Sequence, residues 1–70
     1  MKNIEAKKIS QNLKSARIRA GLTQEQVAEK LGTSRVTISN YERNPLSLSF
    51  VKMKTLADIY DVDIAYFFGG

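Results

Sequence analysis

The chain has 70 residues and a net charge of +4, from 11 Lys and Arg against 7 Asp and Glu, and it contains neither cysteine nor histidine. A chain of this length forms a single domain, residues 1–70, with a small core, because it buries only about 60% of the surface that it exposes when unfolded. The missing side chains exclude disulfides, thiolate metal sites, the commonest metal ligand and the commonest general base. We therefore expect that the protein is not an enzyme and that it has no catalytic residue, no cofactor and no metal site.

The charge is unevenly spread along the chain. Residues 1–20 are rich in Lys and Arg, whereas the only charged side chains in residues 56–70 are acidic. Such an imbalance favours a polyanionic partner on one side, although it also serves solubility. The basic N-terminus lacks the apolar core of a signal peptide, and no run of residues approaches the length of a membrane span. We therefore expect a cytoplasmic protein with no membrane partner.

Apolar residues at roughly helical spacing predict a first helix that ends at Gly21, since glycine tolerates the left-handed conformation after a last turn. These residues are Ile4, Ile9, Leu13, Ala16 and Ala20. The start of this helix is left open, because residues 1–8 form either a basic extension or its first turns.

Two short amphipathic patterns follow, and Gly32 separates them. The first begins at Thr23, which with Gln26 matches a capping box. The second begins at Thr33 or Ser34 and stops before Pro45, since the residue that precedes a proline is pushed out of the α region. The inward residues are expected to be Val27, Ala28 and Leu31 in the first pattern and Ile38 and Tyr41 in the second.

The rest of the chain predicts two more helices. Ser49 can cap the first of them, whose inner face would be Phe50, Met53, Leu56, Ala57 and Tyr60. Asp63 can cap a last short helix that runs through Phe68. No strand pattern survives beside these helices, so we expect an all-α fold with five helices.

The outer face of the third helix is unusual. With Ile38 and Tyr41 turned inward, Arg35, Val36, Ser39 and Asn40 fall mostly outward. A helix surface selected for stability alone would favour better helix formers than valine, serine and asparagine. In the major groove of DNA, arginine can donate two hydrogen bonds to guanine, asparagine can pair with adenine, and valine can pack on thymine methyl groups. The alternative is a merely solvated face.

Gln24 opens the second helix beside amides that are unpaired at a helix start. Helix N-termini bind phosphates, and a glutamine amide adds a further donor. Taken alone, Gln24 reads as an ordinary first-turn residue. Beside a groove-reading helix, it favours a contact with the DNA backbone.

Residues 13–42 also carry a dense set of motif positions. Arg17 stands seven residues before Gln24, Gly-Leu-Thr-Gln leads into the second helix, and Ser-x-x-x-Ile-Ser-x-x-Glu closes the third. On these positions the chain resembles the DNA-binding domain of phage repressors and Cro proteins, also called the xenobiotic-response-element-like family. Looser similarity continues to Phe68. The resemblance implies a compact five-helix lambda-repressor-like domain with a helix–turn–helix at residues 23–42.

The resemblance also implies roles for individual residues. Base contacts fall on Arg35, Val36, Ser39 and Asn40. Phosphate contacts fall on Thr23, Gln24, Ser34, Thr37, Arg43 and Asn44. Arg17 and Glu42 would form an ion pair that orients the reading helix. One departure concerns the loop after the third helix, residues 43–49, where relatives often carry several basic residues and this chain carries only Arg43. Fewer charged contacts predict a shallower dependence of DNA affinity on salt, at about −0.9 per neutralised phosphate.

The expected function is sequence-specific binding of double-stranded DNA by a small homodimeric regulator, most simply a nucleoid-associated repressor that reads a palindrome. One domain contacts too few base pairs to find a site in a genome, so a second copy is needed. We expect the dimer interface at Ile64, Tyr66, Phe67 and Phe68, because one short helix cannot turn three consecutive aromatic residues inward. The competing explanation is that two of them close the core and one is incidentally exposed.

Other functions remain open at this point. A restriction–modification controller or an antitoxin-type autoregulator could use the same fold. A protein–protein interaction module is the alternative from a different class, and the outward set on the third helix and the basic N-terminal half argue against it. An unknown regulatory protein is a possible further partner.

Overall fold

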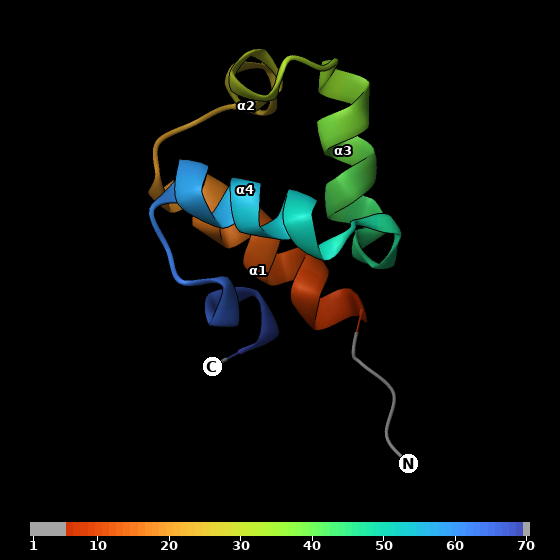
Figure 1. Ribbon diagram of the computed structural model, residues 1–70, viewed down its shortest axis with the longest axis vertical. Coiled ribbons are helices and arrows are strands. Elements are labelled where there is room, and N and C mark those ends of the chain that lie inside the picture. The colour runs from red at the N-terminus through yellow and green to blue at the C-terminus, as the bar shows by residue number, and fades with distance from the viewer. Residues whose placement is uncertain (1–5, 70) are drawn as a thin grey trace.

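The computed structural model describes residues 6–69 (Figure 1). Within that range the chain forms four α-helices, α1 (Ala6–Arg19), α2 (Gln24–Leu31), α3 (Arg35–Arg43) and α4 (Phe50–Tyr60), and two 3-10 helices, η1 (Pro45–Ser47) and η2 (Ile64–Phe68). No strand occurs among these residues, so the all-α expectation is confirmed. Residues 6–8 belong to α1. The other residues of the predicted basic extension, 1–5, lie outside the described range, and Ile4 is among them.

The predicted fifth α-helix is instead the five-residue 3-10 helix η2. The Asp63 side chain accepts from the backbone N–H of Ala65, as the predicted cap requires, but Gly69 ends the element in the left-handed conformation at φ 83°. Five residues leave little room for i to i−4 hydrogen bonds, and short helices commonly adopt the tighter 3-10 form. Residues 6–69 therefore contain one α-helix fewer than expected.

The predicted helix starts around the helix–turn–helix are confirmed. Thr23 and Gln26 form both hydrogen bonds of the capping box, at 3.1 and 2.9 Å. Gly32 follows α2 in the left-handed conformation, at φ 73°. Ser34, and not Thr33, caps α3 by accepting from the N–H of Thr37. Each cap satisfies an amide that a helix start leaves unpaired.

The core is small and draws on every α-helix and on both 3-10 helices. In Figure 1, α4 crosses in front of α1, and η2 closes the lower end of the molecule. Phe67 is wholly buried, and its ring meets those of Tyr60 and Tyr66 edge to face at 6.4 Å between centroids. The largest fully buried side chains are Phe67, Leu13, Ile38, Leu56, Val27 and Pro45.

The expectation for Phe50 is wrong. The sequence predicts this side chain on the inner face of the helix that became α4, yet it is 70% exposed. Phe50 stands at the first position of α4, and the buried side of this helix comes from Met53, Leu56, Ala57 and Tyr60 further along. None of the helices within residues 6–69 is long and apolar enough to cross a membrane, and no cluster of acidic residues in that range could hold a metal ion.

Candidate nucleic-acid interface

Helix α3 presents a row of side chains away from the core. Arg35, Val36, Asn40 and Arg43 are exposed, and Ser39 is half-buried. Val36 is notable because a β-branched apolar side chain stands 58% exposed between polar neighbours. The opposite side of α3 is fixed by Ile38, which is buried. This single turned-out row is the arrangement that the helical spacing predicts.

Asn40 and Arg43 are linked on this row. A guanidinium N–H of Arg43 donates to Oδ1 of Asn40 at 2.6 Å. A bidentate contact with adenine also uses Oδ1 of an asparagine as acceptor and its amide N–H as donor. A carbonyl oxygen has two lone pairs, so Arg43 can remain on Oδ1 and hold the amide in place. The predicted base contact and the predicted phosphate contact therefore form one unit.

The hydroxyl residues of the predicted phosphate set serve the helix starts. Thr23 and Ser34 are exposed and accept from backbone amides, while Ser34 and Thr37 share a hydrogen bond of 3.0 Å between their hydroxyl groups. Asn44 is exposed and ends α3. These residues border the two helix starts and the end of α3 that would face a DNA backbone.

Arg17 and Glu42, expected to pair, are in contact. Nε of Arg17 lies 2.6 Å from Oε2 of Glu42, and Nη1 of Arg17 also donates to the carbonyl of Leu22 at 3.0 Å. The two residues are 9% and 7% exposed. The pair thus joins α1, the turn before α2 and the end of α3 inside the domain. Desolvation offsets much of the attraction in a buried pair, so its main effect is to fix geometry.

The Glu42 carboxylate also holds Gln24, which the sequence alone did not indicate. Nε2 of Gln24 donates to Oε1 of Glu42 at 3.0 Å. The hydroxyl of Ser10 donates to the backbone carbonyl of Glu42, which adds a second contact from α1. Burial, and after it the nearby Glu42 charge, raises the pKa of Tyr60 above its ordinary range. The first residue of α2 and the last turn of α3 are therefore tied to one buried carboxylate.

The C-terminal residues expected at a dimer interface divide into three groups. Phe67 is wholly buried, which corrects its assignment to an interface, because a core side chain cannot also meet a second copy. Ile64 and Tyr66 are half-buried, and the Tyr66 hydroxyl lies 3.1 Å from the Ser15 hydroxyl. Hydrogen bonds from Ser15 and then from Arg19 lower the pKa of Tyr66. Only Phe68, at 49% exposed, offers a large apolar surface.

Phe68 belongs to a hollow that we call the apolar groove. Its exposed rim is formed by Leu46, Phe50 and Phe68, and its floor by Ile9, Pro45, Leu48 and Met53. The sequence offered one signal for it. Phe50 and Val51 are adjacent large apolar residues directly after the predicted cap Ser49, and in the structure they are 70% and 72% exposed.

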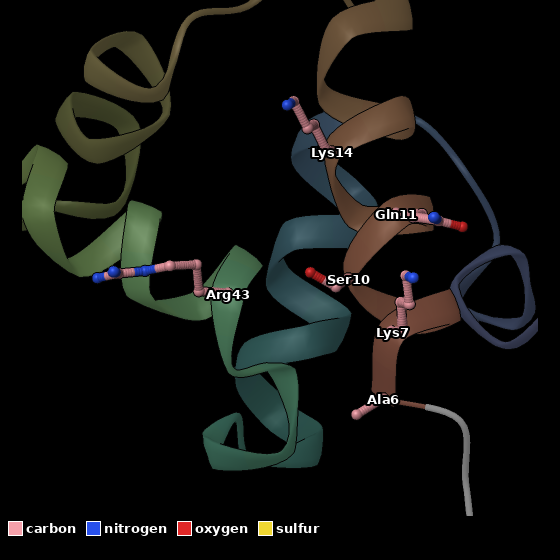
Figure 2. Close-up of a pocket in the computed structure, with 6 residues that line it drawn as sticks. All are labelled: Ala6, Lys7, Ser10, Gln11, Lys14 and Arg43. Atoms are coloured by element: carbon pink, nitrogen blue, oxygen red, sulfur yellow. The ribbon is translucent and has the colours of Figure 1, made fainter.

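A second hollow lies between α1 and the end of α3 (Figure 2). We call it the basic groove, and it is lined by Ala6, Lys7, Ser10, Gln11, Lys14 and Arg43. In Figure 2 the Lys14 side chain extends from α1 toward the space between the two helices, whereas the Arg43 side chain extends along α3 and away from α1. The signal in the sequence was the spacing of four, seven and three residues within the polar positions 7, 10, 11 and 14, which places them on one face of a helix.

Comparison with known proteins identifies a family for this chain. The model of the helix-turn-helix family matches residues 13–67. The HTH-type transcriptional regulator ImmR of Bacillus subtilis (strain 168) is 36% identical over 61 residues, which cover 87% of this chain and 48% of that protein. The chain thus spans about half the length of this curated relative. No solved structure matches it significantly.

The matched region begins at Leu13, in the middle of α1, and ends at Phe67 in η2. It therefore includes both residues of the ion pair and both helices of the helix–turn–helix. The exposed row on α3 and its buried support thus lie inside the family's own boundaries. The chain belongs to the helix-turn-helix family, in the branch of the Cro/C1-like, xenobiotic-response-element-type domains.

Proposed function

We propose that the protein binds double-stranded DNA sequence-specifically as a transcriptional regulator, with α3 in the major groove. The observation that carries this proposal is the exposed row of Arg35, Val36 and Asn40, backed by the buried contact of Arg17 with Glu42. Reading a base sequence requires side chains held in fixed positions on a rigid element. The network behind α3 supplies that rigidity, and the family match supports the class of partner.

Arg35, Val36, Ser39 and Asn40 are proposed to contact base edges. The proposed phosphate contacts are Thr23, Gln24, Ser34, Thr37, Arg43 and Asn44. Gln24 takes a double role here, because one N–H of its amide donates to Glu42 and the other remains available to a phosphate oxygen. A phosphate bound at Gln24 would then set the position of α3 through Glu42.

We further propose that two copies bind together as a repressor of a palindromic site. The apolar groove is the surface that favours a second copy, since its rim of Leu46, Phe50 and Phe68 would otherwise remain in water. Leu46 lies in η1, directly after the end of α3. A two-fold axis at this groove would bring the C-terminal ends of two α3 helices toward each other, and helix–turn–helix dimers read half-sites about 34 Å apart.

Selection of bound sequences from a random pool of duplex DNA tests this function. We expect a palindrome whose half-sites are separated by about one helical turn. Arg35→Ala should lose about 1–3 kcal/mol of discrimination at one position in each half-site, while its non-specific affinity changes little. No binding to any duplex at low salt would rule out DNA as the partner. A selected site without two-fold symmetry would rule out the symmetric dimer.

A further inference from the structure

The polar residues of α1 lie on two faces, and only one of these faces makes several side-chain contacts with the rest of the domain. On the face toward η2, the Asn12 amide donates to the Phe67 carbonyl at 3.1 Å, Ser15 meets the Tyr66 hydroxyl, and Arg19 stacks over the Tyr66 ring at 5.8 Å. Those side chains are used to attach η2. Polar residues on this face therefore have a structural explanation.

The other polar face of α1 lines the basic groove and lacks such an explanation. Lys7, Gln11 and Lys14 are exposed, and they make no hydrogen bond or ion pair with any other residue of the described range 6–69. Ser10 alone is engaged, through the carbonyl of Glu42. Among residues 6–69 no carboxylate lines the groove, which has a volume of about 520 Å³. Concentrated positive charge without an acidic partner is the arrangement that attracts an anion.

The basic groove is continuous with the proposed reading face. Arg43 forms one wall of the groove and at the same time holds Asn40 on the exposed row of α3. Side chains at the end of a helix that lies in the major groove approach the sugar–phosphate backbone that borders it. The backbone next to Arg43 would thus continue past Lys7 and Lys14 on α1.

The spacing of these charges suits a strand of phosphates. Lys7 and Lys14 are two turns apart on α1, or about 10.5 Å. One DNA strand carries a phosphate about every 3.4 Å along the helix axis, so the two ammonium groups can each reach a different phosphate. Ser10 and Gln11 lie between them and also line the groove; in Figure 2 the Ser10 hydroxyl faces α3, whereas the Gln11 side chain points away from it.

We propose that the basic groove is a second backbone-binding strip, in which Lys7 and Lys14 of α1 contact phosphates that flank the half-site read by α3. This inference rests on the proposed DNA-binding function and adds α1 to the binding surface. It also alters the expectation from the loop after α3, whose only basic residue is Arg43. The charges that this loop lacks are supplied by α1.

The test is the salt dependence of affinity for the duplex that the wild-type protein selects from a random pool. We compare the wild type with Lys7→Gln/Lys14→Gln and with the matched control Lys8→Gln. Lys8 is the neighbouring lysine on the same helix, but its side chain lies against Gly69 and away from the groove. Each lost phosphate contact lowers the magnitude of the slope of log affinity against log salt by about 0.9.

We expect the double variant to lose about 1.8 in the magnitude of that slope for each bound copy, or about 3.6 for two copies on a palindrome, with an unchanged base preference. Lys8→Gln should keep a slope close to that of the wild type, and so should Lys7→Arg/Lys14→Arg, which retains both charges. Circular dichroism should find all variants folded, because the replaced side chains are exposed. Replacing single phosphates by neutral methylphosphonates should weaken the wild type, but not the double variant, at the same flanking positions.

Two results would overturn the inference. One is a double variant with the wild-type slope, which would leave the groove to an acidic protein or to no ligand. The other is a loss in Lys8→Gln of half that of the double variant, the same loss for each charge removed, which would mean that overall charge and not the groove is responsible. Both differ from failure of the proposed function itself, in which the wild type binds no duplex at low salt.

Discussion

The outer side of α3 and the rim of the apolar groove are both exposed, but they are supported in different ways. Behind α3 lies a polar network, in which Arg17 and Gln24 both bind the carboxylate of Glu42. Behind the apolar groove lies the packed core, with Phe67 next to the exposed Phe68. A polar network fixes directions, whereas apolar packing provides free energy with less directional control. The difference suits a surface that reads bases and a surface that meets a second copy.

The largest expected effect comes from breaking the network behind α3. Arg17→Ala or Glu42→Ala leaves the other charge buried without its partner, so each should lower the free energy of unfolding by about 3–5 kcal/mol. The double variant should lose clearly less than the sum, because neither charge is then left behind. Urea denaturation of the three variants measures this. Additive losses would show that the two residues act independently.

Two neighbouring aromatic residues, Phe67 and Phe68, test the difference between the packed core and the rim of the apolar groove. Phe67→Ala should cost about 3–5 kcal/mol of stability, since it removes a fully buried ring from the core. Phe68→Ala should cost less than about 1 kcal/mol in the monomer, because the ring is 49% exposed. Thermal and urea denaturation at low protein concentration give both values. Equal costs would place Phe68 in the core with Phe67.

A charge on the rim of the apolar groove should weaken self-association with a smaller effect on the fold. Phe68→Asp places a carboxylate where the proposed second copy would bury an apolar ring, and burial of an unpaired charge is costly. Sedimentation should give a dimer for the wild type and a monomer for this variant over the same concentration range. Ile18→Asp is the matched control, since Ile18 is 57% exposed but lies outside the groove. Dimerisation of Phe68→Asp as tight as that of the wild type would remove this surface from the proposal.

The helix starts could be predicted from the sequence because their hydrogen bonds are local. Thr23 with Gln26 and Ser34 with Thr37 lie three residues apart, so the pattern of residue types contains the whole interaction. The contact between Arg17 and Glu42 spans 25 positions, and only the resemblance to a family predicts it. The inward residues of α2 and α3 followed from helical periodicity, which depends on the sequence alone.

The remaining features depend on how the helices cross. Gln24 and Glu42 meet because the start of α2 lies beside the last turn of α3, and no local pattern encodes that distance. Phe50 has the spacing of a core residue, yet nothing in the described range covers the start of α4. The basic groove likewise requires α1 and the end of α3 to lie next to each other. Sequence patterns identified the faces of single helices, and tertiary structure decided which faces meet.

The smallest expected effect is on the stability at alkaline pH, to which two tyrosines contribute in opposite directions. Tyr60 lies on the side of the Glu42 network, where burial and then the Glu42 charge raise its pKa, so its stabilising contribution is present below about pH 10 and is lost as the pH rises further. Tyr66 lies beside Ser15 and Arg19, which lower its pKa, so its contribution has the opposite sign and increases as the pH rises toward 10. Ultraviolet titration of the phenols should therefore find one group that ionises below the ordinary pKa and one that ionises only as the protein unfolds. Tyr66→Phe should remove the early step and Tyr60→Phe the late one. If Tyr66→Phe leaves the early step in place, the hydrogen bonds that attach η2 to α1 do not hold in solution, and the comparison loses its C-terminal half.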